Sequence, residues 1–303
     1  FHAAVLGMLG AELFFNRQPR EITASEGAAW TTGWIVLALL WGAGTWYLAG
    51  SRSGLEFLTG YVIELSLSID NVFVFVVVFS YFQVPREFRY RVLMWGVMGA
   101  LLMRGAMIGA GTFLIHRFDW ILYVFGGFLV LTGLRMVRQD DHEVNPENNP
   151  LLRVLRKWIP ITKRYYGQQF FIERMGRRAA TPLFVTLIVI ESTDVVFAVD
   201  SIPAIFGVTQ EPFIVYTSNI LAVACLRSLY FVLEGAVQKF RYLDLGIAAV
   251  LVFIGLKLLL HDALHIPILV SLLLVVSILG GSVAASAWVD GEDGEDGSEE
   301  VEQ

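Results

Sequence analysis

The sequence predicts an all-α polytopic membrane protein with about nine transmembrane helices. Of its 303 residues 56% are apolar and only 17% are charged, and long apolar runs recur along the whole chain. An ordinary soluble domain is about 45–50% apolar and about 25% charged. The runs do not alternate polar and apolar residues as membrane β-strands do, so helices are expected.

Nine spans follow from the apolar runs, because about 20 apolar residues cross a bilayer as a helix. They cover residues 1–15, 30–49, 57–82, 90–115, 119–137, 181–206, 212–234, 242–261 and 265–289. We expect one transmembrane domain, 1–289, with a long connection over 138–180. Eight acidic residues among the last fourteen predict a disordered acidic tail, 290–303. Pro203 predicts a break in the sixth span near Asp200.

Lysine and arginine are divided unequally between alternate connections, and this division predicts the orientation. Seventeen lie in the connections after spans one, three, five and seven, whereas the other connections hold only Arg52 and Arg117. We therefore expect the N-terminus outside the cell. The 138–180 connection and the C-terminal tail are expected in the cytoplasm.

Two parts of the chain repeat each other. Glu64 and the pair Asp70-Asn71 in the third span correspond to Glu191 and Asp194 in the sixth. The next spans carry matching pairs at one spacing, Gly96 with Arg104 and Asn219 with Arg227. The third and sixth spans enter the membrane from opposite sides, so spans 3–5 and 6–8 are predicted to form an inverted repeat. Such repeats place a substrate site at their interface near the midplane.

Five carboxylates lie in the third and sixth spans, and a charge in mid-bilayer costs at least about 2.5 kcal/mol. This cost indicates that the carboxylates have a function. Glu64, Ser68 and Asn71 share one face of a regular helix, and Glu191 and Asp194 share another. Asp70 and Asp200 do not lie on these faces unless their helices unwind. We predict that Glu64, Asn71, Glu191 and Asp194 converge on one site.

Oxygen ligands without a nearby histidine or thiolate suit a hard divalent cation, Mn²⁺, Mg²⁺ or Ca²⁺. Arg104 and Arg227 are either permanent partners of the acids or counter-charges that occupy the site when the cation has left, and we favour the second role. Pairs that only pin helices together are a weaker explanation, because two arginines cannot neutralise five carboxylates.

Two segments resemble the signatures of the TerC family of membrane proteins. They read Glu64-Leu-Ser-Leu-Ser-Ile-Asp70-Asn71 and Glu191-Ser-Thr-Asp194-Val-Val-Phe-Ala-Val-Asp200-Ser-Ile-Pro-Ala. Thr217-Ser218-Asn219 is most similar to the Alx branch, whose members have nine predicted spans. The resemblance implies a manganese exporter of the bacterial plasma (inner) membrane. It also implies a cation path formed by Glu64, Asp70, Asn71, Glu191, Asp194 and Asp200.

The leading hypothesis is therefore a secondary transporter that exports Mn²⁺, with Mg²⁺ or Ca²⁺ as the alternative cargo, against an inward flux of protons. No Gly-x-x-x-x-Gly-Lys loop for nucleotide occurs. The alternative is a non-transporting membrane partner in metal delivery or tellurite resistance. We expect no enzymatic activity, no tightly bound cofactor and no nucleic-acid partner. The expected partners are lipid, the metal ion and protons, with a second copy of the chain or the secretion machinery left open.

Overall fold

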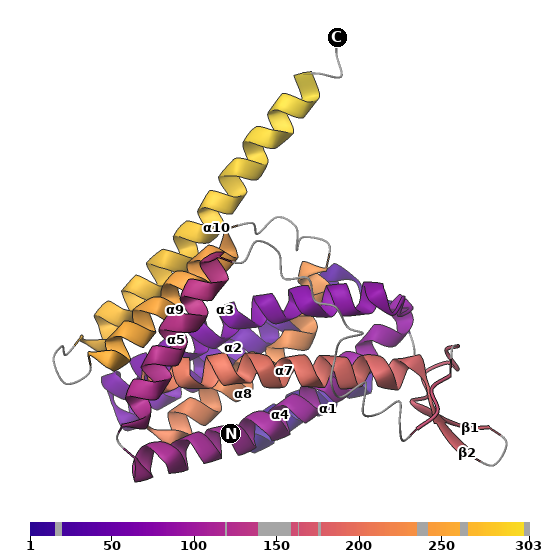
Figure 1. Cartoon of the computed structure of the whole chain (residues 1–303), viewed down its shortest axis with the longest axis horizontal. Helices are drawn as coiled ribbons and strands as arrows, with labels where there is room; N and C mark the ends of the chain where they lie inside the picture. The colour runs from indigo at the N-terminus through magenta and orange to yellow at the C-terminus, as the bar shows by residue number, and fades with distance from the viewer. Residues whose placement is uncertain are drawn as a thin grey trace.

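The computed structural model is a bundle of long helices with one short β-hairpin (Figure 1). It describes residues 1–15, 20–118, 120–138, 159–162, 164–174, 177–234, 242–260 and 266–299. Within these ranges, the side chains of Asp70, Arg138, Arg174, Arg177 and residues 287–299 are not described. Each predicted span corresponds to one helix of the described part, and the predicted fold class is confirmed.

The helices are α1 (His2–Phe15), α2 (Ala24–Ala49), α3 (Ser51–Tyr81), α4 (Arg86–Arg117), α5 (Ile121–Arg138), α7 (Pro182–Phe206), α8 (Pro212–Leu233), α9 (Leu243–Leu259) and α10 (Ile268–Glu299). Among the described residues, six helices are long and apolar enough to cross a membrane, namely α2, α3, α4, α7, α8 and Ile268–Ser286 of α10. The apolar parts of α1 and α5 are shorter.

Several helices begin before the apolar run that predicted them. Thr23 and Glu26 form a capping box at the start of α2, so this helix begins at Ala24 rather than at the predicted residue 30. Gly50 follows α2 at a φ of +94°, a conformation that favours glycine, and lets α3 start at once. The first turns of α3 therefore carry Glu56, which lay outside the predicted span.

The predicted break in the sixth span is wrong. Helix α7 is continuous from Pro182 to Phe206 and includes both Asp200 and Pro203. Proline removes only the bond to the carbonyl of Val199, and Pro203 lies in the last turn, where few helical bonds remain to be lost. The side chain of Pro203 is also buried among neighbouring helices. Asp200 consequently keeps the direction that a regular helix gives it.

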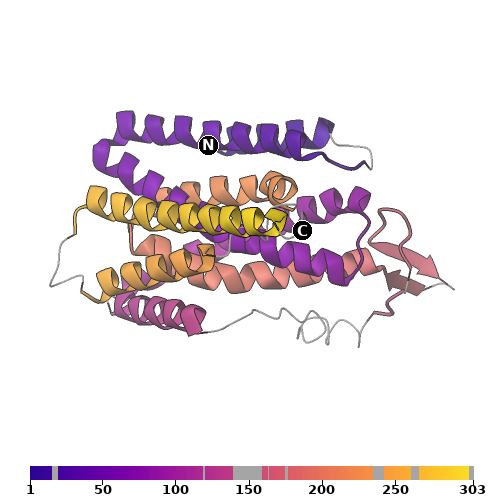
Figure 2. The same ribbon diagram turned by 90° about the horizontal axis from the view of Figure 1, so that it is seen from above.

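The centre of the bundle consists of α3, α4, α7 and α8, in which α3 and α4 each pack against both α7 and α8. Helix α2 lies along one side of the bundle, and α5 and α9 lie along the opposite side (Figure 2). Helices α5 and α9 touch backbone to backbone. A Cβ on Gly126 would lie 2.8 Å from the Gly255 oxygen, and one on Gly255 would lie 2.7 Å from the Gly126 oxygen. Small residues permit this close crossing.

An antiparallel hairpin, β1 (Phe171–Arg174) and β2 (Arg177–Ala180), precedes α7 and was not predicted. Tyr165 ties this segment to the bundle by donating to the Phe82 oxygen at 2.7 Å. Burial raises the pKa of Tyr165 to about 12. Arg91 of α4 adds a bond to Gln168 at 3.1 Å. The described part of the 138–180 connection is therefore anchored at one end of the bundle.

Helix α10 runs on past the predicted end of its span at residue 289. Its backbone is helical to Glu299 and extends away from the other helices (Figure 1). The sequence predicted disorder for residues 290–303. That disordered tail stays a prediction.

Candidate functional site

Arg104 of α4 is the centre of a buried ionic group. Its Nε and Nη2 donate to the two oxygens of Asp194 of α7, at 3.2 Å and 3.0 Å. Its Nη1 pairs with Oε1 of Glu64 of α3. Arg104 and Glu64 are fully buried, and Asp194 is 3% exposed. One guanidinium therefore joins two carboxylates from two different helices, and the formal charges of the trio sum to −1.

Two neutral side chains complete the surroundings of Arg104. Ser201 of α7 accepts from Nη1 at 3.4 Å, and Asn219 of α8 accepts from it at 3.5 Å. Ser201 lies seven residues after Asp194, so both project from one face of α7. The sequence reading missed Ser201, although this spacing was available. Four helices thus meet at one arginine.

Several buried polar atoms near these helix faces have no hydrogen-bond partner among the described residues. They are Oε2 of Glu64, Oγ of Ser68, Oδ1 of Asn71 and Oε2 of Glu191, with Nδ2 of Asn219 as the one donor-only atom. Native proteins leave few buried polar atoms unpaired. Four of the five are oxygens, the atom type that hard divalent cations bind.

Glu191 lies against α4 beside Gly99. A Cβ on Gly99 would lie 2.0 Å from Oε1 of Glu191 and 2.5 Å from its Oε2. Its carboxylate occupies the space that the missing side chain leaves. Glu191 lies beside Gly99 and Asp194 pairs with Arg104, so both acidic side chains point from one side of α7 toward α4.

The predicted ligands are only partly brought together. Glu64 and Asp194 meet at Arg104, Glu191 rests on Gly99, and Asn71 is buried further along α3. In the part of the chain that the structure describes, no three His, Cys, Asp or Glu residues are grouped closely enough to hold a metal ion. The Arg104 guanidinium lies between Glu64 and Asp194, two of the carboxylates that the sequence predicted as cation ligands.

Asp200 lies apart from this centre. Its Oδ1 accepts from the Thr132 hydroxyl of α5 at 3.3 Å. Because α7 does not unwind, Asp200 faces α5 rather than Arg104. The helix α3 is likewise continuous through Asp70, whose side chain is outside the described part.

Arg227 belongs to a second buried pair. It contacts Glu12 of α1 and the sulfur of Met94, and its guanidinium carbon lies 5.1 Å from the centre of the Tyr90 ring. Trp34 also donates to Glu12 at 3.4 Å. Arg227 is thus not placed against the carboxylates of α3 and α7. The sequence reading did not consider Glu12, although it is a lone acid within an apolar span.

Comparisons with known proteins give the family. Residues 49–293 match the integral membrane protein TerC family. The chain is 48% identical over 287 residues to an uncharacterized membrane protein of Myxococcus xanthus, covering 94% of this chain and 90% of that protein. It is 45% identical over 300 residues to Alx of Escherichia coli (strain K12), covering 96% and 94%. The name of that protein describes a candidate membrane-bound redox modulator.

A more distant relative, an uncharacterized membrane protein of Rickettsia felis, is 34% identical over 287 residues, with 94% of this chain and 95% of that protein covered. No solved structure matches the chain. The match to the family covers most of the sequence, and the relatives are similar over nearly their whole length. The chain belongs to the TerC family of integral membrane proteins.

Proposed function

We propose that this protein is a secondary transporter that exports Mn²⁺, with Mg²⁺ or Ca²⁺ as the alternative cargo, across the bacterial plasma membrane. One observation carries the proposal. Glu64 and Asp194 share a single fully buried arginine, and other oxygens on the same two helices are buried without a partner. Charges and unpaired oxygens inside a membrane domain are expensive, and they mark ion paths.

The transport step is an exchange between Arg104 and the cation. When Arg104 occupies the site, its guanidinium neutralises one of the two carboxylates. When a divalent cation replaces it, Glu64 and Asp194 bind the ion directly, and the unpaired oxygens of Ser68, Asn71 and Glu191 are the further ligands. An oxygen-only set of this kind suits Mn²⁺, Mg²⁺ or Ca²⁺. Asp70 and Asp200 join the path only after their surroundings rearrange.

Release of the cation is coupled to protonation in this scheme. After the ion leaves, Arg104 returns to Glu64 and Asp194, but no guanidinium contacts Glu191 among the described residues. A proton is then the least costly way to neutralise that carboxylate inside the membrane. We therefore propose an inward proton for each cycle of export, carried by Glu191.

The inverted repeat and the orientation are parts of the same proposal. Helix α3 packs against α7, α4 against α8 and α5 against α9, which is the pairing expected of two interlocked repeats. The basic residues in alternate connections favour an outer N-terminus and a cytoplasmic C-terminus.

Mn²⁺ uptake into everted membrane vesicles, with a pH probe inside, tests the function. Wild type should accumulate Mn²⁺ and release protons from acidic vesicles, whereas Asp194→Asn and Glu191→Gln should not. Ser68→Ala should lower the flux, since its hydroxyl has no partner in the resting state. Ser66→Ala is the matched control, because Ser66 already donates to the Val62 oxygen of its own helix at 2.8 Å. Normal flux in both carboxylate variants would refute the proposal.

A non-transporting role in metal delivery, stress resistance or redox control is the alternative. A direct dithiol reaction within one chain is not available, because the sequence contains only Cys225, and that residue is buried. A scaffold also has no use for Arg104 and its two carboxylates in mid-bundle. If vesicles containing the wild-type protein show no cation flux, this alternative replaces transport. We propose no enzymatic activity in either case.

A further inference from the structure

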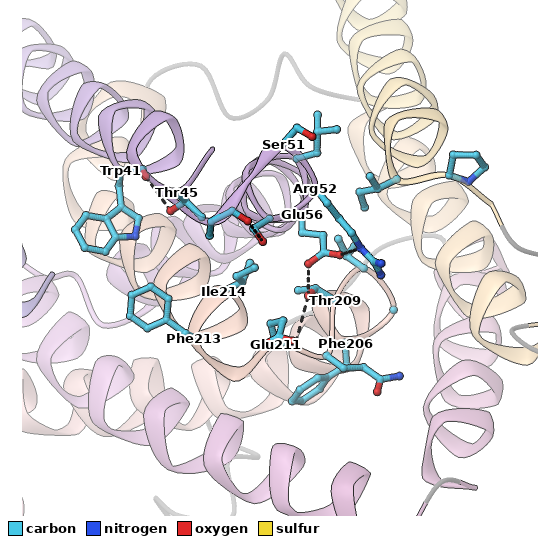
Figure 3. A pocket seen from close by; sticks show the side chains of 18 of the residues that line it. Trp41, Thr45, Ser51, Arg52, Glu56, Phe206, Thr209, Glu211, Phe213 and Ile214 are labelled. Carbon is cyan, nitrogen blue, oxygen red and sulfur yellow. Dashed lines mark hydrogen bonds and ion pairs between the residues drawn. The ribbon is translucent and has the colours of Figure 1, made fainter. Parts of the chain in front are cut away.

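A cavity of about 1300 Å³ opens at one end of the bundle. It is bounded by the α2–α3 turn, the α7–α8 connection, the end of α9 and the start of α10. Figure 3 shows Trp41, Arg52, Glu56, Thr209 and Phe213 arranged around it. In the predicted orientation this end of the bundle faces the outside of the cell.

Glu56 of α3 is the buried charge of this cavity. Its side chain is 7% exposed, and its Oε1 accepts from Nε of Arg52 at 2.9 Å. Its Oε2 accepts from the Thr209 hydroxyl at 2.7 Å (Figure 3). The Arg52 side chain is 86% exposed, so its removal from Glu56 loses little packing. The Glu56 carboxylate is held by the buried Thr209 hydroxyl, whereas the Arg52 guanidinium that pairs with it is exposed.

The other charged groups at the cavity do not form an anion site. Glu211 lies at the exposed edge, where its backbone N–H donates to the Thr209 hydroxyl at 3.2 Å. Lys257 donates to the Ser271 hydroxyl of α10 at 3.1 Å. Among the described residues that line the cavity, the deeply buried charge is therefore the carboxylate of Glu56, and it favours a cation.

A buried polar stripe on α3 leads from Glu56 to the Arg104 centre. It consists of Glu56, Glu64, Ser68 and Asn71, with Gly60 between the two glutamates. All five residues are buried and are spaced by three or four residues on one helix face. Glu56 and Glu64 lie about 12 Å apart along the axis, at about 1.5 Å per residue. Between them, Gly60 presents no side chain. A Cβ there would lie 3.0 Å from the Ser218 hydroxyl of α8.

We propose that the cavity is the outer vestibule of the transport path and that Glu56 is its outer cation-binding residue. A divalent cation released from Glu64 and Asp194 passes between Gly60 and Ser218 when α3 and α8 move apart there, and it then displaces Arg52 from Glu56. It then leaves through the vestibule, and Arg52 returns. This inference rests on the proposed function, because it assigns the exit for the same cargo.

Single cysteines test whether the vestibule is open to the outside and lies on the path. In a Cys225→Ala background, Thr45→Cys places a thiol in the cavity wall, and Tyr47→Cys places one in the same turn of α2 but outside the lining. An impermeant maleimide added outside intact cells should label Thr45→Cys. The label should block Mn²⁺ export there and leave export by Tyr47→Cys unchanged. No labelling of Thr45→Cys, labelling without a loss of flux, or equal loss in both variants would overturn the proposal.

Substitution of Glu56 separates this proposal from the function on which it rests. Glu56→Gln should lower Mn²⁺ flux about 10–100-fold, the range for losing a supporting group in a metal site. Stabilisation of the purified protein by Mn²⁺ should persist, because Glu64 and Asp194 are intact. Normal flux in Glu56→Gln refutes the role of Glu56 and leaves transport standing. No flux in wild type refutes transport, while protection of Thr45→Cys from maleimide by Mn²⁺ still reports whether the vestibule binds the cation.

Discussion

Replacing Arg104 by glutamine tests the central idea that the arginine and a cation compete for the same two carboxylates. In the structure, three guanidinium nitrogens bind Glu64 and Asp194. Removing one partner of a buried ion group costs about 3–5 kcal/mol, because the other charges are left unpaired. Without a cation, the Arg104→Gln protein should therefore be less stable than wild type by about that amount.

Mn²⁺ should restore much of this loss. In wild type the ion must first displace Arg104, whereas in Arg104→Gln the carboxylates are vacant and repel each other. A ligand at about 100 times its dissociation constant stabilises the folded state by about 2.7 kcal/mol. We expect a stabilisation of that size in Arg104→Gln and a much smaller one in wild type at the same Mn²⁺ concentration.

The assay is thermal unfolding of the purified protein in detergent, with and without Mn²⁺. Arg227→Gln is the matched control, because Arg227 is also fully buried but pairs with Glu12 instead. It should lose stability to a similar extent without gaining any extra response to Mn²⁺. If Mn²⁺ stabilises Arg104→Gln no more than it stabilises wild type, the competition between arginine and cation does not exist.

Three further outcomes follow. A cysteine at Asn149 in a cysteine-free background should resist impermeant maleimide outside intact cells, and labelling there would reverse the predicted orientation. Gly126→Ala should lower the unfolding temperature, because a Cβ would lie 2.8 Å from a backbone oxygen of α9, an overpacking of about 1–3 kcal/mol. Gly127→Ala, with nothing within 4 Å of its Cβ, should not, and equal effects would contradict the close crossing of α5 and α9. Gly99→Ala should abolish Mn²⁺ flux as Glu191→Gln does, because a Cβ 2.0 Å from Oε1 of Glu191 must displace that carboxylate; unchanged flux would mean that the position of Glu191 is unimportant.

The sequence by itself determined the helices and their polar faces. Hydropathy is a local property, and a run of apolar residues long enough for a bilayer is visible without any knowledge of its neighbours. The spacing of Glu64, Ser68 and Asn71 likewise predicted one face of α3, and all three are buried in the structure. The helix period also predicted that Asp200 lies off the face of Asp194, and its bond to Thr132 agrees with that.

Only the tertiary structure decided which charges meet. Arg104 is separated from Glu64 by 40 residues and from Asp194 by 90 residues, and no local pattern relates them. The two arginines look equivalent in the sequence, yet one lies between α3 and α7 and the other against Glu12 of α1. A charge in a membrane domain takes the partner that the packing of whole helices brings within reach. That packing depends on side-chain shapes along every interface rather than on the residues around the charge.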